Sequence, residues 1–526
     1  MDQEEQKKDT STVVKRGSIE AHAYVFTASF CLMVIELVAG RIMAPYLGSS
    51  LYTWTSVIGV VLTGITLGNY VGGVLAERGA RWKSVATLFA FAGFALAVSF
   101  YTYSPTSDFV YALGLPMPMA TFIFSFVGFF PMSILLSMIT PIVITLSLTS
   151  LKKTGTTVGR IYAVSAAASI AGTFAAGYVL IPLLGVKTIV LIVSAVLLLA
   201  GILASRGGTA KELAVKVAVL LLWASFLTPK FCLVETAYYC ISVDPAMSER
   251  GYGHRLILDR LTHSFVFNDP DILEYDYETV YGVVTEYAHR RLDGKRPLRT
   301  LSIGGGGYTM PKYVVDNYSG AQVDVVEIDP MVTETNVKHL GLNPYGDIRT
   351  YNQDARMFMA HGADGNRYDV IFGDAFNDYS IPYHLTTVEF LESVRDTLTP
   401  GGIYAMNSID DFERGRVLAS FLRTVGEVFP YVEVSPMGHD WKKVGRNTFI
   451  IFASFEPFDR YEWNVSADSA FADHILSPYS LPLADAKFLM PADEMSFLVS
   501  DRKGILLTDN YAPVDSLTAP LFSRRQ

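Results

Sequence analysis

Long apolar runs fill the first part of this 526-residue chain and restrict what it can fold into. Each run is long enough, or nearly so, to cross about 30 Å of hydrocarbon as a helix that rises about 1.5 Å per residue. The runs occupy residues 21–47, 52–76, 84–103, 120–148, 158–185, 187–205 and 212–229. We therefore predict a multi-span α-helical membrane domain over residues 20–230, with seven spans as the best count and six or eight as alternatives.

Two of these runs carry features that argue against a simple crossing. The run 120–148 contains Pro131 and Pro141, so we expect it to be kinked or divided. The run 212–229 is close to the minimum length for a span and contains Lys216, which makes it the weakest candidate.

Charge divides the chain into two unlike parts. Residues 20–230 carry 12 basic and 5 acidic side chains, a net charge of +7, whereas residues 231–526 carry 26 basic and 42 acidic ones, a net charge of −16. The polar N-terminal tail, residues 1–19, is neutral overall. This contrast excludes a purely soluble and a purely membranous protein. We expect membrane lipid as a partner and no nucleic acid, since nothing in the acidic part would neutralise phosphates.

The three cysteines are too few for a disulfide scaffold or a zinc site, and we predict no metal. Cys31 lies in the first apolar run, where a small packing residue is expected. Cys232 and Cys240 follow the last run. They are either two unlinked thiols or a disulfide, and a disulfide would require an oxidising compartment.

The second part of the chain alternates strand-like and helix-like segments in the order of a nucleotide-binding βαβ unit. A strand at 299–303 leads into Gly304–Gly307 and then into a helix expected at 310–317. A second strand, 323–329, carries Glu327 near its end. Glycines let the backbone approach a ligand, and an acid at the end of the second strand accepts hydrogen bonds from ribose hydroxyls.

Two further acidic residues are expected at the same edge of this sheet. Asp354, next to Ala355, follows a short strand at 348–351 and is suited to binding an adenine amino group. The strand 368–374 ends in Asp374. Ligands of open α/β sheets bind outside the carboxyl ends of the strands. Since a P-loop and its lysine are missing, we expect a nucleoside with a small cationic tail and no phosphate.

These segments resemble the spermidine synthases, which are aminopropyltransferases built on the methyltransferase-type Rossmann fold. The resemblance rests on Gly304–Gly307, Val326–Asp329, Asp354–Ala355 and Tyr368–Asp374, and upstream on Leu258–His263 and Glu274–Glu278. The segments Leu507–Asn510 and Pro513–Val514 resemble a tail of membrane-fused members. The resemblance implies a small β-rich region at 235–290 and a Rossmann-like nucleoside-binding catalytic domain at 291–520.

The resemblance also assigns roles by position. Asp374 would be the catalytic residue, and Tyr277, Glu278 and Asp378 would face the amine. The donor-binding residues would be Gly304, Gly305, Gly306, Glu327, Asp354, Ala355 and His263. The implied reaction transfers an aminopropyl group from decarboxylated S-adenosylmethionine to a polyamine such as putrescine and releases methylthioadenosine. No permanently bound cofactor is expected, and a homodimer is left open.

One position departs from the family pattern. Gly307 stands where the family has an aspartate that holds the ammonium of the donor's aminopropyl group. Without that acid a donor carboxylate is no longer repelled, so intact S-adenosylmethionine is an alternative co-substrate. Two alternative functions remain: another S-adenosylmethionine-dependent enzyme, such as a methyltransferase or lyase, and a ligand-binding transporter or sensor without turnover.

Two arguments disagree about the side of the membrane on which the catalytic part lies. Basic residues gather in alternate loops, and by the positive-inside rule the N-terminus is cytoplasmic, so seven spans would place the catalytic part outside. Adenosyl donors are made in the cytosol, which favours the inside. We expect a multi-pass protein of the cell membrane with a cytoplasmic catalytic domain, in which the run 212–229 lies along the cytoplasmic surface.

Overall fold

The computed structural model describes residues 18–148, 153–205, 232–375, 381–472 and 483–522. The chain divides into a helical unit, built mainly from residues before 230, and an α/β unit, built mainly from residues after it. Each unit has its own set of buried hydrophobic residues.

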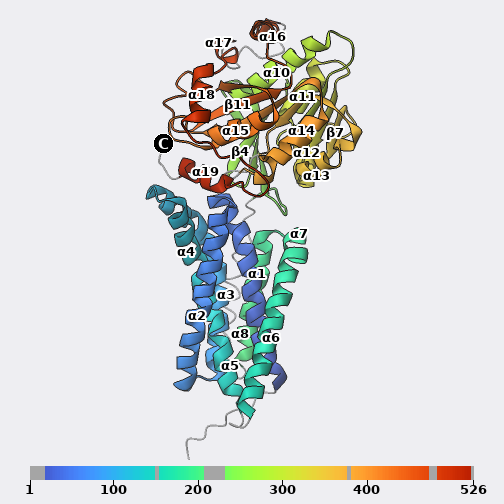
Figure 1. The fold of residues 1–526 in the computed structure, drawn as a ribbon. Helices are drawn as coiled ribbons and strands as arrows, with labels where there is room; N and C mark the ends of the chain where they lie inside the picture. The colour runs from blue at the N-terminus through green and yellow to red at the C-terminus, as the bar shows by residue number, and fades with distance from the viewer. Residues whose placement is uncertain (1–17, 149–152, 206–231, 376–380, 473–482, 523–526) are drawn as a thin grey trace, which may run out of the picture. The chain divides into compact units, whose positions relative to one another are not determined.

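The helical unit contains, among the residues described, six helices that are long and apolar enough to cross a membrane (Figure 1). Their elements are α1 (Ser18–Leu47), α2 (Leu51–Glu77), α3 (Trp82–Ala112), α4 (Met117–Ser137), α5 (Ile139–Ser147), α6 (Thr154–Ala175), η3 (Ala176–Leu180), α7 (Ile181–Leu183) and α8 (Val186–Ala204). The run 120–148 is divided between α4 and α5, as expected. The seventh predicted run, 212–229, lies outside the described residues.

Small residues let the helices of this unit approach one another closely. A Cβ atom on Gly172 of α6 would lie 2.6 Å from the backbone oxygen of Phe30 on α1. A Cβ atom on Gly68 of α2 would lie 2.5 Å from the backbone oxygen of Ile134 on α4. Any side chain at these two positions would push the helices apart, which is the packing that small residues serve in apolar bundles.

The α/β unit begins with a four-stranded antiparallel sheet in the order β1-β2-β3-β4. Its strands are β1 (Val234–Glu235), β2 (Cys240–Ser248), β3 (Gly251–Leu258) and β4 (Leu261–Phe267). A disulfide joins Cys232 to Cys240, so of the two alternatives left open by the sequence the structure has the disulfide. Leu256 and Leu258 alternate along β3 and pack into a small core with Ile241 and Val332.

A seven-stranded sheet in the order β10-β11-β9-β8-β5-β6-β7 forms the centre of the unit. Strands β5 to β9 run parallel, whereas β11 is antiparallel to both of its neighbours. The strands are β5 (Arg299–Ile303), β6 (Gln322–Val326), β7 (Ile348–Tyr351), β8 (Tyr368–Gly373), β9 (Leu398–Asp410), β10 (Tyr431–Pro436) and β11 (Asn447–Ser454). The predicted fold class, a Rossmann-like domain with a small β-rich region, is confirmed.

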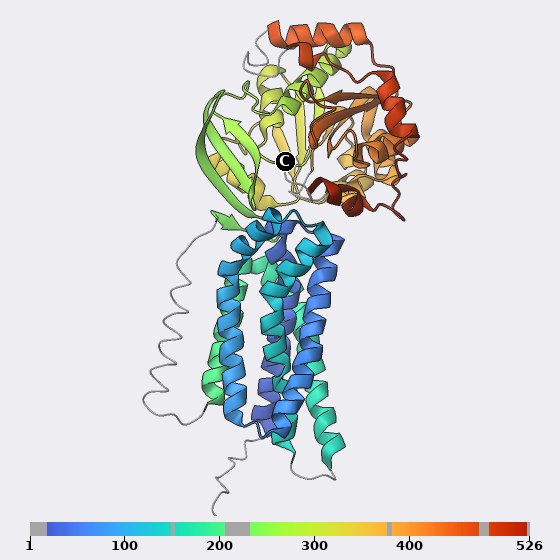
Figure 2. The same ribbon diagram turned by 90° about the vertical axis from the view of Figure 1, so that its left-hand side faces the viewer.

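Helices cover both faces of this sheet, as Figure 2 shows from the side. One face packs under α10, α11, α16 and α17, and the other under α13, α14, α15, α18 and α19. The helices are α10 (Asp276–Leu292), α11 (Thr309–Asn317), α12 (Pro330–His339), α13 (Ala355–Ala360), η4 (Ala363–Gly365), η5 (Tyr383–Leu385), α14 (Val388–Thr397), α15 (Val417–Val428), α16 (Arg460–Ala472), α17 (Leu483–Ala486), α18 (Ala492–Ser500) and α19 (Val514–Phe522). Because the strand order reverses at β5, which lies between β6 and β8, the ligand crevice is expected at the carboxyl end of β5.

Candidate active site

Asp374 follows β8 directly, next to the carboxyl end of β5. Its backbone N–H donates to the carbonyl of Ile303, the last residue of β5, over 3.1 Å. The phenolic hydroxyl of Tyr277 on α10 donates to Asp374 Oδ2 over 3.1 Å, and the amide of Asn407 on β9 donates to Asp374 Oδ1 over 3.0 Å. Each carboxylate oxygen is therefore fixed by one donor and keeps a lone pair for a substrate proton.

A second carboxylate belongs to Glu278, the residue that follows Tyr277 on α10, and this residue is 2% exposed. The Thr309 hydroxyl donates to its Oε1 over 2.5 Å, and the Tyr275 backbone N–H donates to its Oε2 over 3.2 Å. Tyr277 and Glu278, both predicted to face the amine, thus lie on the first turn of α10, and Tyr277 is hydrogen-bonded to the predicted catalytic residue.

Burial shifts the pKa values of both acids upward. Desolvation raises the pKa of Asp374 to about 6, although the hydrogen bonds from Asn407 and Tyr277 oppose the shift. Desolvation raises the pKa of Glu278 to about 7, and the nearby charge of Asp374 adds to the effect. Two carboxyls that titrate near neutrality at a strand edge are suited to accept a proton from an ammonium ion or amine.

Glu327 follows β6 and faces the glycine loop. Its Oε2 accepts from the backbone N–H of Gly305 over 2.7 Å, and its Oε1 accepts from that of Asp329 over 2.9 Å. Gly304, at φ +95°, could carry no side chain, since its Cβ would lie 2.9 Å from the Asp374 backbone oxygen. The loop therefore passes over the strand ends at close range, as the predicted nucleoside-binding role of these residues requires.

Asp354 follows β7 and caps α13, which begins at the buried Ala355. Its Oδ1 accepts from the backbone N–H of Met357 over 3.0 Å, and its Oδ2 lies 3.1 Å from His384 Nε2. The predicted adenine-binding carboxylate is thus at the same sheet edge as Glu327 and Asp374. The His384 contact was not predicted.

Side chains of β4 occupy the space beside Gly307, the position at which the family has an aspartate. A Cβ atom on Gly307 would lie 2.6 Å from both Ser264 Cβ and Val266 Cγ2 of β4. The Gly307 backbone N–H donates to Ser264 Oγ over 2.9 Å. The next residue, Tyr308, is fully buried at φ +56°, with its hydroxyl 2.9 Å from that of Thr333. An acidic side chain at 307 would therefore collide with β4.

His263, one of the predicted site residues, is not brought into this arrangement. His263, on β4, places Nδ1 3.1 Å from the Leu261 oxygen and its ring against Tyr239, while the adjacent Ser264 contacts the glycine loop. Successive side chains of a strand point to opposite faces, which explains the difference. Asp378 lies outside the described residues. Their roles stay predictions.

Sequence reasoning missed Asn407, Thr309 and Ser264. Asn407 carried a usable signal, because it directly follows the strand's apolar stretch at 403–406, and the sheet order places that strand beside β8. Thr309 and Ser264 carried none, since their contacts join segments far apart in the sequence. Within the described residues no three His, Cys, Asp or Glu side chains gather as a metal site would require.

Comparison with known proteins agrees with this geometry. Residues 285–437 match the family model of the spermine/spermidine synthase domain, a stretch that contains Glu327, Asp354, Asp374 and Asn407. This part of the chain is therefore similar to the spermine/spermidine synthase domain. The other contributors to the site, Tyr277 and Glu278, precede the matched stretch of the synthase domain.

Several curated proteins and solved structures are similar to the synthase domain. The polyamine aminopropyltransferase of Vibrio vulnificus is 36% identical over 114 residues, which cover 22% of this chain and 38% of that protein. The human eEF1A lysine and N-terminal methyltransferase is 29% identical over 123 residues, covering 22% and 18% of the two chains. A probable spermidine synthase from Corynebacterium glutamicum is 25% identical with a TM-score of 0.39, over 46% of this chain and 88% of its own. The chain spans less than two-fifths of the length of either curated relative.

Proposed function

We propose that this protein is a membrane-bound aminopropyltransferase of the spermidine synthase type. The donor would be decarboxylated S-adenosylmethionine and the acceptor an amine of the polyamine class. The observation that carries the proposal is the pairing of Tyr277 and Asn407 on Asp374 at the carboxyl edge of a matched synthase domain. Six apolar helices support attachment to the membrane.

In the proposed reaction an unprotonated amine attacks the aminopropyl carbon bound to the donor's sulfonium. A new C–N bond forms, the C–S bond breaks, and its electron pair passes to sulfur, so that methylthioadenosine leaves. Asp374 accepts the proton that the amine must lose, and Tyr277 and Asn407 hold the carboxylate in place. Because the sulfonium is already a good leaving group, alignment of the two substrates supplies much of the remaining acceleration.

A second candidate, methyl transfer from intact S-adenosylmethionine, is favoured by one observation. Ser264 and Val266 occupy the space that an acid at position 307 would need, so the donor's aminopropyl ammonium lacks its family partner. Similarity to a curated methyltransferase points the same way.

Product analysis distinguishes the two candidates. The purified full-length protein is incubated with each donor and a panel of amines, and the products are identified by mass spectrometry. Methylthioadenosine with an aminopropylated amine supports the proposal, whereas adenosylhomocysteine with a methylated amine would replace it by the second candidate. An Asp374→Asn variant serves as the control for enzyme-dependent product.

A further inference from the structure

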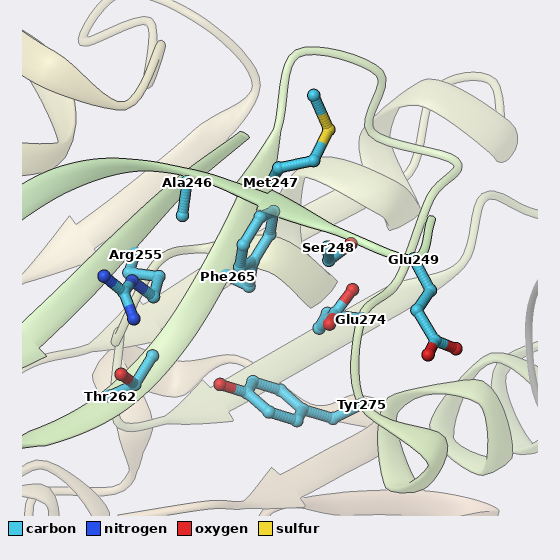
Figure 3. Close-up of a pocket in the computed structure, with 9 residues that line it drawn as sticks. All are labelled: Ala246, Met247, Ser248, Glu249, Arg255, Thr262, Phe265, Glu274 and Tyr275. Carbon is cyan, nitrogen blue, oxygen red and sulfur yellow. The ribbon is translucent and has the colours of Figure 1, made fainter. Parts of the chain in front are cut away.

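A cavity of about 590 Å³ opens beside the first turn of α10, between the small sheet and the segment that precedes the helix (Figure 3). Its walls include Arg255 and Phe265 from the sheet, and Glu274 and Tyr275 from the segment. This volume is within the range of small-molecule sites in proteins. Neither the family match nor the predicted site residues account for the cavity.

The cavity adjoins the proposed amine site through two stacked rings. The Tyr275 ring, which lines the cavity, stacks on the Tyr277 ring at a centroid distance of 5.9 Å and an interplanar angle of 14°. Tyr277 in turn donates to Asp374. A substrate whose reacting nitrogen lies at Asp374 would therefore extend its other end toward this cavity.

The lining of the cavity carries both signs of charge, with Arg255 facing the two acids Glu249 and Glu274. Arg255 is exposed to the cavity and forms no ion pair with another described residue. Glu274 has a buried Oε2 without a hydrogen-bond partner. In the view of Figure 3 these two side chains lie on opposite sides of Phe265. A buried carboxylate oxygen without a donor is costly, and a ligand ammonium would satisfy it.

Arg255 is the lining residue that most restricts the kind of ligand the cavity can bind. A simple polyamine has only ammonium groups, so it would leave Arg255 without a partner, and Arg255 would repel an ammonium placed beside it. A carboxylate would instead accept two N–H groups of the guanidinium. The salt bridge between Arg250 and Asp276, at 3.0 Å, ties the cavity's two walls together and keeps this arrangement in place.

We propose that the cavity holds the far end of the acceptor and that this end is an amino acid group, so that the acceptor is a diamino acid and not a plain diamine. Arg255 would bind its carboxylate and Glu274 its α-ammonium, while the side-chain amine reaches Asp374. The inference rests on the proposed transfer to an amine and specifies its substrate class.

A matched pair of amines tests the inference, since ornithine is putrescine with an added α-carboxylate. Binding of each to the full-length protein is measured by calorimetry in detergent with methylthioadenosine present. Ornithine is expected to bind at least about 10-fold more tightly than putrescine. Arg255→Gln should abolish that preference by weakening ornithine binding, while putrescine binding stays equal or becomes tighter. Glu274→Gln should weaken both, and Arg395→Gln, near the end of α14, should change neither.

Equal or tighter binding of putrescine to the unaltered protein, or ornithine binding that Arg255→Gln or Glu274→Gln leaves unchanged, would overturn the inference. Turnover is recorded separately from binding. Arg255-dependent binding of ornithine without product from any amine would keep this site and reject the proposed function. Turnover of putrescine without a preference for ornithine would keep the proposed function and reject the diamino acid site.

Discussion

In the proposed reaction Asp374 accepts a proton near neutral pH, in surroundings that disfavour its charge. Burial raises the pKa of Asp374 to about 6 and that of Glu278 to about 7. Because a protonated Asp374 cannot act as a base, kcat at saturating substrate should fall as the pH drops through about 7 to 6, with apparent values that belong to the pair. The profile of methylthioadenosine release between pH 5 and 9 checks this. A kcat that stays level down to pH 5 would contradict it.

The Asp374→Asn variant separates catalysis from stability. We expect kcat to fall by about 10²- to 10⁴-fold, the usual contribution of a positioned base. A raised folded-state pKa means that the folded state binds the proton more tightly than the unfolded state. The contribution of Asp374 to stability is then fully present below about pH 4 and is lost as the pH rises through about 6. Denaturation at pH 5 and pH 8 should therefore show the variant relatively more stable at pH 8, and a pH-independent difference would refute this.

We expect position 307 to influence which donor the site prefers. Gly307→Asp alone should destabilise the domain, since its Cβ would lie 2.6 Å from Ser264 Cβ. Combined with Ser264→Gly and Val266→Ala, which remove both atoms at 2.6 Å, the new carboxylate gains room to hold the donor's ammonium. We expect the combined variant to raise its preference for decarboxylated over intact S-adenosylmethionine about 10-fold. Competition binding of the two nucleosides measures the ratio, and an unchanged ratio would disprove the role of this position.

At the scale of elements, the strands and the acids that follow them could be predicted from sequence. The strands at 299–303 and 348–351 coincide with β5 and β7, because short segments that contain β-branched or aromatic residues and end before turn-forming residues encode both. β9 begins at Leu398 and contains an irregularity at 399–402, where its register with β8 shifts. Ser264 and the Arg255 cavity could not be predicted, because each depends on pairing between distant segments.

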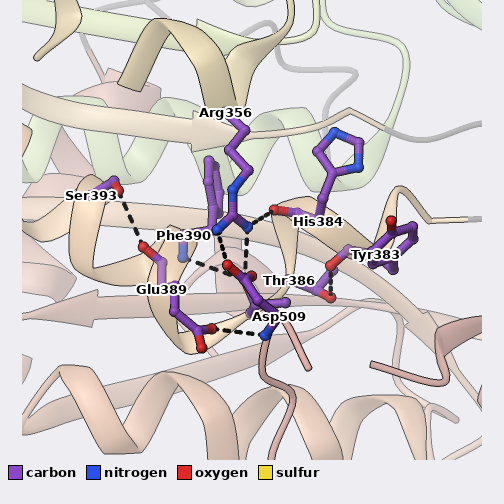
Figure 4. A network of polar contacts seen from close by, with 9 residues as sticks. Arg356, Tyr383, His384, Thr386, Glu389, Phe390, Ser393 and Asp509 are labelled. Carbon is purple, nitrogen blue, oxygen red and sulfur yellow. Dashed lines mark hydrogen bonds and ion pairs between the residues drawn. The ribbon is translucent and has the colours of Figure 1, made fainter. Parts of the chain in front are cut away.

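The segment before α19 contributes a network that holds the predicted adenine site (Figure 4). Arg356 on α13 donates to the carbonyl of His384 over 2.7 Å and forms an ion pair with Asp509. Asp509 also accepts from the Thr387 hydroxyl over 2.8 Å. This network therefore ties α13, which Asp354 caps, to the segment that carries His384.

We expect Asp509→Asn to weaken donor binding more than catalysis. The lost ion pair is partly exposed, so the free energy of unfolding should fall by only about 1 kcal/mol. KM for the donor should rise several-fold with kcat nearly unchanged, because α13 is held less firmly. Asp501→Asn, at an exposed position after α18, is the matched control. Equal changes in both variants, or a loss confined to kcat, would contradict this role.

At the scale of the whole molecule, the Cys232–Cys240 disulfide bears on the side of the membrane. Disulfides persist in oxidising compartments and are rare in the cytosol. The disulfide therefore favours the outside, against the cytoplasmic location that donor supply favours. In a Cys31→Ser background, we expect both cysteines to resist alkylation in intact cells until a reductant is added. Alkylation by a membrane-permeant reagent without a reductant would show free thiols, and would favour a cytosolic location of the catalytic unit.

Helix α10 has a consequence for how the acceptor enters. Every residue from Glu278 to Ala288 is buried, and the helix packs against α11, α16, β8 and β9. Its amide hydrogens should exchange with solvent only when the whole α/β unit unfolds, whereas those of β2 and β3 exchange through local opening. The wall that carries Tyr277 and Glu278 is then a fixed template. In the proposed reaction, acceptor entry and product release would then depend on local opening of the opposite wall, which the small sheet forms.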